Sequence, residues 1–291
     1  MHRLLKAGIL LLALFTLFAA FSRGKAQAAF ERGKSITVVS RESGSGTRGA
    51  FIELLGIEAR TPDGARKDMT TKEAIIANKT DVMISNVANA PYAIGYISLG
   101  SLNSSVKALI VDGVAATTGN VKNGSYKISR PFMLATGSNL SALAGDFIGF
   151  ILSAEGQKVV SNGYIPVNSA AAAYKGSRPS GKITVAGSSS VTPIMEKLKE
   201  AYIALNPAAA IEIQMSDSTS GMLAAINGSC DIGMASRDLK SSELERLKAI
   251  PIALDGIAVI VNRENPVSGM TSRQIKDVFT GALEYWSQIG E

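Results

Sequence analysis

The sequence predicts an α/β fold with mainly parallel strands. Two observations favour this class: short apolar runs typical of β-strands alternate with segments of helical periodicity, and small polar turns join several strands directly to the following helix. Parallel neighbours in a sheet require crossover connections of this kind. The strand candidates, in chain order, are residues 35–39, 93–98, 108–111, 183–186, 209–214, 232–235 and 256–261.

Two longer segments are predicted to form amphipathic helices between these strands. Apolar residues recur at helical spacing within residues 146–162 and within residues 194–205. Residues 168–181 interrupt the alternation with small residues, a proline and glycines, so they are predicted to form a surface linker. A short helix over the alanines at 170–173 is the alternative, because alanine favours helix.

Residues 1–28 are predicted to be a secretory signal peptide. Arg3 and Lys6 precede an apolar run over residues 7–21, and the sequence Ala-Gln-Ala at 26–28 resembles a cleavage site. The run is shorter than the roughly 20 residues that a spanning helix needs, although an uncleaved anchor is the alternative. No cysteine lies directly after the cleavage site, so a lipid anchor there is not indicated. We therefore expect a periplasmic or secreted protein.

Charge and composition exclude several classes of function. Removing the predicted signal peptide takes away four basic residues, so 30 basic residues against 24 acidic residues become 26 against 24. A nucleic-acid partner is therefore not expected, because such proteins concentrate Lys and Arg on one face. The only histidine, His2, lies in the signal peptide, and the only cysteine is Cys230. Ser-His-Asp catalysis, Cys-His catalysis and thiolate or imidazole zinc sites are excluded, and we expect no metal or cofactor.

Four turns of one kind each lead from a strand into a helical segment. They include residues 40–50, 187–193, 215–221 and 236–238, and the segments after them are expected to be helical over 51–55, 194–205, 222–226 and 239–247. In the second turn Thr192 is predicted to cap the helix, with Pro193 at its first position. Ligands bind at the carboxyl ends of strands in open α/β sheets, where helix amides favour an oxyanion. Arg41 adds a planar guanidinium that can donate two hydrogen bonds to one anion. For each turn taken alone, the alternative is that it simply caps the following helix.

Several longer segments resemble one family of binding proteins. ITVVSRESGSGTRGAF, AIGYISLGSL, FILSAEGQKVV, ITVAGSSSVTPIMEKL and DIGMASRDL are similar to segments of the periplasmic phosphate-binding proteins of phosphate ABC transporters, the PstS family. The resemblance covers nearly all of the chain after the signal peptide. It implies a two-lobed periplasmic-binding-protein-like clamp, in which each lobe is a mixed, mainly parallel sheet flanked by helices. Inorganic phosphate would bind between the lobes.

The order of these segments differs from the order in the family. Family members begin with the segment similar to ITVAGSSSVTP, which follows the other half of the chain here. The resemblance therefore implies a circular permutation, with residues 168–181 linking the family's original termini. One lobe is expected to comprise residues 29–105 and 263–291 and to contain the SGSGT motif, and the second lobe residues 106–262. Permutation is tolerated where the new ends lie on an exposed loop.

The resemblance also implies which residues bind phosphate. Two further candidates, Ser236 and Arg237, come from the fourth turn, although Arg237 is alternatively expected to pair with an acid at the lobe edge. The ligand residues implied by the family motifs are Arg41, Ser45, Gly46, Thr47, Ser190, Val191, Thr192 and Ser218.

One acidic position of the family motif is changed in this chain, which has Ser43 there. A carboxylate accepts the hydrogen bond of a protonated phosphate and repels sulfate, which has no proton near neutral pH. We expect Asp217 to supply this acceptor, with Glu42 as the second choice. Capping of the following helix is the alternative role for Asp217.

The resulting functional prediction is a monomeric, extracytoplasmic solute-binding protein that delivers phosphate to an ABC permease and is not an enzyme. One alternative is a binding protein or sensor for another oxyanion. A second alternative is a phosphate-ester hydrolase using Arg41 and a serine nucleophile, but no general base or cluster of metal-binding carboxylates is evident for it.

Overall fold

The computed structural model describes residues 30–61 and 66–290. Residues 1–31 and 32–291 form separate units, and all helices and strands named here belong to the second unit. The predicted signal peptide lies outside the described residues. Among the residues that are described, no helix is both long enough and apolar enough to cross a membrane.

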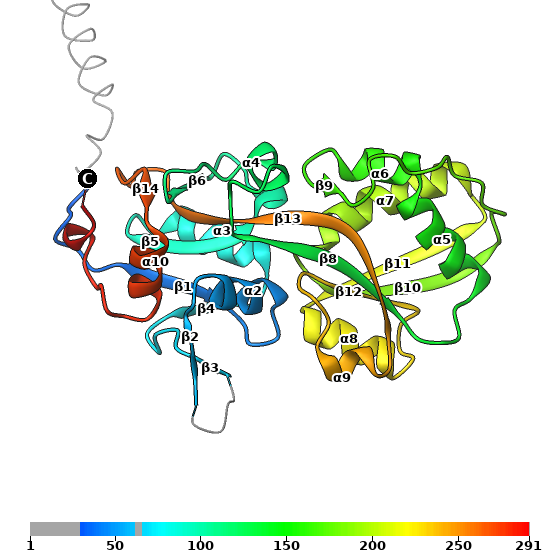
Figure 1. Cartoon of the computed structure of the whole chain (residues 1–291), viewed down its shortest axis with the longest axis horizontal. Helices are drawn as coiled ribbons and strands as arrows, with labels where there is room; N and C mark the ends of the chain where they lie inside the picture. The colour runs from blue at the N-terminus through cyan, green and yellow to red at the C-terminus, as the bar shows by residue number, and fades with distance from the viewer. Residues whose placement is uncertain (1–29, 62–65, 291) are drawn as a thin grey trace, which may run out of the picture. The chain divides into compact units, whose positions relative to one another are not determined.

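A ten-stranded sheet forms the centre of the unit (Figure 1). Strand β6 (Val106–Ala108) and strand β9 (Ile165–Pro166) pair with β13 off the main path. Along the main path the order is β11 (Ala209–Ser216), β10 (Gly181–Ser188), β12 (Ile232–Ala235), β8 (Ser129–Thr136), β13 (Lys248–Asn262), β5 (Ala93–Ser98), β1 (Thr37–Arg41) and β4 (Ile75–Ala77).

Two long antiparallel strands, β8 and β13, connect the two ends of this sheet and lie side by side in Figure 1. On one side β4, β1 and β5 are parallel to one another, and on the other side β12, β10 and β11 are parallel. We call the first set, with its helices, the β1 half and the second set the β10 half. The predicted α/β class is confirmed, and the sheet is mixed: each half contains a parallel set, and β8 and β13 pair antiparallel with their neighbours.

Helices cover the sheet of each half. The β1 half includes α2 (Gly46–Leu54), α3 (Thr80–Asn89) and α10 (Ser272–Phe279), and the β10 half includes α5 (Ala142–Leu152), α6 (Ala154–Val160), α7 (Thr192–Leu205), α8 (Ser218–Ile226) and α9 (Ser241–Leu244). The remaining elements are β2 (Glu58–Arg60), β3 (Arg66–Asp68), η1 (Leu99–Ser101), β7 (Ile110–Val111), α4 (Thr118–Lys122), β14 (Gly269–Met270) and η2 (Trp286–Gln288).

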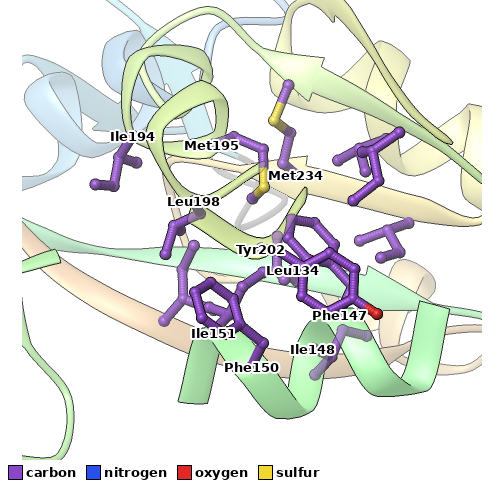
Figure 2. Close-up of a cluster of buried hydrophobic side chains, with 14 of the residues drawn as sticks. Leu134, Phe147, Ile148, Phe150, Ile151, Ile194, Met195, Leu198, Tyr202 and Met234 are labelled. Atoms are coloured by element: carbon purple, nitrogen blue, oxygen red, sulfur yellow. The ribbon is translucent and has the colours of Figure 1, made fainter. Parts of the chain in front are cut away.

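Apolar side chains fill both faces of the β10 half. On one face, residues of α5 and α7 such as Phe147, Leu198 and Tyr202 pack against Leu134 of the sheet (Figure 2). The opposite face packs against Met222 of α8 in a separate buried cluster. Burial of this apolar area stabilises the half by roughly 25 cal/mol per Å² and fixes the first turns of α7 and α8 against the strand ends.

The β1 half has a corresponding arrangement. Val39 of β1 packs with Met83 of α3 in one cluster. Phe51 of α2 stacks on Tyr96 of β5 with ring centroids 3.9 Å apart, and Phe279 of α10 meets Phe51 edge-on. The amino-terminal turns of α2 and α3 are therefore fixed beside the carboxyl end of β1.

Several element boundaries differ from the predictions. The single helix expected over 146–162 is two helices, because Ser153 ends α5 and its side chain caps α6 by accepting a bond from Gly156 N–H. The run 108–111 is divided between β6 and β7, and the strand expected at 256–261 is the end of the longer β13. The helix expected over 239–247 is limited to α9.

The predicted linker is an irregular segment that hydrogen bonds attach to helix α5. Residues 168–180 contain neither helix nor strand, and β10 begins at Gly181. The Asp146 carboxylate accepts hydrogen bonds from the Tyr174 hydroxyl and from Ser177 N–H, the latter at 2.9 Å. The helix considered for residues 170–173 is not formed. The Ala172 carbonyl instead accepts from Ala154 N–H of α6, and Ala170 N–H donates to the Asn168 side chain.

Strand pairing divides the sheet differently from the predicted lobe boundaries. Val106 and Ile260 belong to the same buried cluster as Val39, and β6 pairs with the end of β13. Along β13 the partner changes from β8 at Gly256 to β5 at Ile257. The two ends of the range 106–262 therefore belong to the β1 half, because their apolar side chains complete its core.

A buried ion pair joins β8 and β13 near the boundary between the halves. Arg130 and Asp255 face each other in the ladder, with Nη2 3.2 Å from Oδ2. Burial raises the pKa of Asp255, and the charge of Arg130 opposes this shift. Burial also lowers the pKa of Arg130, and the Asp255 carboxylate opposes this shift. Two of its nitrogens, Nε and Nη1, have no hydrogen-bond partner among the described residues.

Candidate functional site

Buried hydroxyl groups gather where the two halves of the sheet meet. Thr47 and Thr80 come from the first turns of α2 and α3 in the β1 half. The β10 half contributes residues at the end of β10, at the start of α8 and just after β12. None of the members is more than 3% exposed. We call this set the hydroxyl cluster; it comprises Thr47, Thr80, Ser188, Ser189, Ser190, Ser218 and Ser236.

Hydrogen-bond distances within the hydroxyl cluster join the two halves. Thr47 Oγ1 lies 2.8 Å from Ser190 Oγ, and Thr80 Oγ1 lies 3.3 Å from the hydroxyls of Ser189 and Ser190. Ser236 Oγ accepts a bond from Ser188 at 3.0 Å. Each hydroxyl can either donate or accept, so the same groups can turn their hydrogens toward an anion.

Arg41 places a buried cation beside this cluster. The residue is 2% exposed at the end of β1, and its Nη2 donates to Ser189 Oγ at 3.0 Å and its Nη1 to Thr80 Oγ1 at 3.4 Å. Both Glu42 oxygens receive further bonds from the guanidinium, at 2.7 and 2.8 Å. Glu42 therefore fixes the plane of the guanidinium and compensates its charge.

A second arginine supports the loop that holds Arg41. Arg48 Nη1 donates to the main-chain carbonyl of Arg41 at 2.6 Å and its guanidinium pairs with Asp68. Burial opposes ionisation of Asp68, but hydrogen bonds from Thr70 and Arg48 keep the pKa of this carboxyl below its usual range. The hydroxyl oxygen of Tyr96 accepts a hydrogen bond from the main-chain N–H of Arg41. Burial raises the pKa of the Tyr96 hydroxyl. The orientation of Arg41 is therefore fixed from several sides.

At Gly46 the main chain of α2 comes close to the β10 half. A Cβ atom at this position would lie 2.5 Å from Ser218 Oγ and 2.9 Å from Ser236 Oγ, which is closer than real Cβ atoms come. Only glycine therefore allows the first turn of α2 to reach the hydroxyl cluster. Ser45 acts as the cap of α2 by accepting a bond from Arg48 N–H at 3.3 Å.

The turn before α8 combines capping with a contact to the opposite half. Asp217 caps α8 by accepting bonds from Ser220 N–H at 2.9 Å and from Ser220 Oγ at 2.6 Å. Its carboxylate also lies against Gly44, where a Cβ atom would come within 2.2 Å of Oδ1. The capping alternative for Asp217 is thus realised, beside the SGSGT turn. Ser43, the position of the missing acid, is exposed.

Arg237 is engaged by an acidic partner, as the alternative prediction stated. Its two terminal nitrogens donate to both Glu243 oxygens at 2.8 Å. Burial opposes ionisation of Glu243, but hydrogen bonds from Arg237 and Lys240 N–H keep its pKa below the usual range. Ser236, in contrast, lies within the hydroxyl cluster.

The start of α7 differs from its predicted capping. Val191, fully buried, is the cap residue and makes no side-chain capping bond, and Thr192 is the first helical residue. Thr192 Oγ1 donates to the carbonyl of Ser188 at 3.1 Å instead of capping the helix. The prediction of Thr192 as the cap was wrong, because the tight turn from Ser188 to Val191 begins the helix one residue earlier.

Three cluster members were absent from the predicted ligand set: Thr80, Ser188 and Ser189. Ser188 and Ser189 belong to the second predicted turn, at residues 187–193, so the run of serines was the available signal. Thr80 follows the short strand β4, which gave no clear pattern. No group of three or more His, Cys, Asp or Glu side chains suited to a metal ion occurs within the described part of the chain.

The chain is similar to known proteins over most of its length. A family model described as the PBP superfamily domain matches residues 10–155 and 172–291. Phosphate-binding protein PstS 2 of Streptococcus agalactiae is 53% identical over 260 residues, which cover 88% of this chain and 88% of that protein. The crystal structure of a phosphate-binding protein of a phosphate ABC transporter from Streptococcus pneumoniae matches with a TM-score of 0.70 and 46% identity, over 88% of this chain and all of that one.

A third relative matches over a shorter length. Phosphate-binding protein PstS of Pseudomonas aeruginosa is 31% identical over 132 residues, which cover 40% of this chain and 41% of that protein.

Proposed function

Because the chain belongs to the PBP superfamily and, within it, to the PstS phosphate-binding proteins, we propose that it captures inorganic phosphate between its two halves. It then delivers the ion to the permease of an ABC transporter. The observation that carries this proposal is the buried hydroxyl cluster beside Arg41, where the first turns of α2, α3, α7 and α8 meet. Hydroxyls, a guanidinium fork and helix amino termini together suit a compact oxyanion.

The two halves act as the lobes of the clamp. From the change of strand partners along β13, we assign residues 32–128 and 257–290 to one lobe and residues 129–256 to the other. Phosphate replaces direct contacts between hydroxyls, such as the one between Thr47 and Ser190, with contacts to its own oxygens. Because donors from both lobes contact one ion, binding favours the closed arrangement.

The proposed ligand set follows the predicted one, with additions. Arg41, Thr47, Ser190, Ser218 and Ser236 donate from their side chains, and the backbone near Gly46 and Val191 adds amide groups. Ser45 and Thr192 act through the helix turns that they stabilise. Thr80, Ser188 and Ser189 join the set because their hydroxyls lie within the same cluster.

A circular permutation relative to other PstS proteins accounts for the two kinds of match. The S. agalactiae relative aligns with most of this chain in one order, whereas the P. aeruginosa relative aligns with 40% of it. A permuted relative aligns in sequence with one of its two blocks at a time, which supports the proposal. The segment at 168–180 then joins what would be the family's original termini.

The sequence and the family membership support the proposed location, oligomeric state and lack of covalent chemistry. Residues 1–28 direct export, so the protein acts outside the cytoplasm, and it functions as a monomer without covalent chemistry, cofactor or nucleic-acid partner. An esterase would need an activated nucleophile and a base, which the hydroxyl cluster and its arginine do not supply.

Calorimetric titration tests the central proposal. We expect phosphate to bind tightly to residues 29–291 that have been stripped of ligand, and excess sulfate not to displace it near neutral pH. A folded sample that fails to bind phosphate would contradict the proposal and direct the search to other oxyanions. Release of phosphate from a generic ester in the presence of a divalent metal would favour the hydrolase alternative.

Selectivity against sulfate provides a second test. Asp217→Asn retains a capping side chain for α8 but removes the negative charge beside Gly44. If Asp217 accepts the proton of bound phosphate, this change lowers the preference for phosphate over sulfate by about tenfold, which corresponds to about 1.4 kcal/mol. Competition titrations measure the ratio. An unchanged ratio would assign Asp217 to capping alone and make Glu42→Gln the next variant.

A further inference from the structure

One contact between the halves lies outside the hydroxyl cluster. The carbonyl oxygen of Gly44, in the SGSGT turn, accepts two hydrogen bonds from Thr219 in the first turn of α8. The Thr219 N–H and Thr219 Oγ1 are each 3.2 Å from this oxygen. The loop that contains Arg41 is therefore attached directly to a helix of the opposite half.

A charged pair fixes the direction of the Thr219 hydroxyl. Arg237 Nη2 lies 3.4 Å from Thr219 Oγ1 and can only donate to it. The hydroxyl must then use its own hydrogen for the Gly44 carbonyl. Glu243 binds both terminal nitrogens of Arg237, and the Glu243 and Arg237 side chains are 8% and 12% exposed. Arg237 is thus held toward Thr219 by a nearly buried, ionised carboxylate.

Small residues of α2 make room for this arrangement. A Cβ atom at Gly46 would lie 3.0 Å from Cγ of Arg237, and one at Gly49 would lie 4.0 Å from its Cδ. The aliphatic part of Arg237 therefore packs along the first turn of α2, which belongs to the other half. This packing requires the halves to be close together.

We propose that Thr219, Arg237 and Glu243 form a closure latch on the Gly44 carbonyl, and that this latch sets the rate at which phosphate leaves. The inference rests on the proposed function. The latch residues position the two halves and do not contact the ion. Phosphate enters the open form, in which the latch is not made, whereas release from the closed form requires the latch to break first. The latch therefore acts on the dissociation rate and leaves the association rate unchanged.

Stopped-flow kinetics with inorganic phosphate test the latch on the full exported chain. Thr219→Val keeps the shape and the N–H group but removes the hydroxyl, so we expect the dissociation rate constant to rise about tenfold. The association rate constant is expected to stay within about twofold. Thr219→Ser restores a hydroxyl and is expected to restore slow dissociation. Glu243→Gln, which weakens the hold on Arg237, is expected to raise the dissociation rate less.

Ser161→Ala is the matched control. The Ser161 hydroxyl also donates to a main-chain carbonyl, that of Lys158 at 2.7 Å, but this bond lies within one half. Its dissociation rate is expected to remain that of the parent protein. A slower association with unchanged dissociation in both Thr219→Val and Glu243→Gln would overturn the latch. Failure of the parent protein to bind phosphate would instead overturn the proposed function, so the two failures are distinguishable.

Discussion

Replacing Arg41 with methionine is expected to lower the affinity for phosphate by at least about a hundredfold. The guanidinium is buried beside the hydroxyl cluster and already aligned by Glu42 and Ser189. Two hydrogen bonds to a charged group contribute together about 3 to 6 kcal/mol, which corresponds to a factor of at least about 100 in the dissociation constant. Arg41→Lys keeps the charge but lacks the fork, so an intermediate affinity is expected. Calorimetric titration measures all three proteins.

Arg66→Met is the matched control for this experiment. Arg66 is half exposed and pairs with Glu53 and Glu58 on the surface. Surface ion pairs contribute little, so its affinity for phosphate is expected to equal that of the parent protein. If folded Arg41→Met bound phosphate within tenfold of the parent affinity, the ion would have to be held elsewhere, and the proposed site would be wrong.

The second large effect concerns stability. Asp255→Ala is expected to lower the free energy of unfolding by about 3 to 5 kcal/mol, because it leaves the buried Arg130 charge without its partner. Arg130 already has two unpartnered nitrogens among the described residues, so the loss cannot be made up within the strand pair. Urea denaturation measures the change. The slope of the transition is expected to stay constant, since the same surface is exposed on unfolding.

A double variant separates lost pairing from a simple packing defect. Arg130→Met combined with Asp255→Leu removes both charges, and it is expected to recover most of the stability lost in Asp255→Ala. Glu212→Ala breaks an exposed pair with Lys182 and is expected to change stability by less than about 0.5 kcal/mol. A double variant as unstable as Asp255→Ala would show that shape, and not charge, determines the cost.

The sequence predicted strands best where apolar runs end in polar turns. The predicted ranges of β5 and β12 agree with the structure residue for residue, because each is a short apolar run before a polar turn. Strand β8 was missed, since Arg130 and Pro131 at its start are untypical of a central strand. The long β13 was seen only in part, because Pro251 and Asp255 interrupt its apolar pattern.

The sequence predicted site residues only where they lie in a turn directly after a strand. Arg41, Thr47, Ser190, Ser218 and Ser236 follow strands in the sequence, and the structure brings them together. The contribution of Thr80 depends on β4 pairing beside β1, which no local pattern indicates. The pairing of Arg237 with Glu243 likewise depends on how α9 folds back after a turn. Such contacts result from packing between distant segments, and local propensity does not encode them.

The ladder shared by β8 and β13 has a mechanical consequence. The chain passes between the halves twice, at Ser129 and at Gly256, and these two residues are paired at the end of the ladder. We expect two adjacent, paired connections to limit sliding of one half past the other. Opening is therefore expected to occur mainly by bending at this paired connection. Closing is then expected to bring Thr47 and Ser190 back to the same contact. The binding protein therefore loses little orientational freedom when it closes, and more of the contact energy with phosphate remains available as affinity.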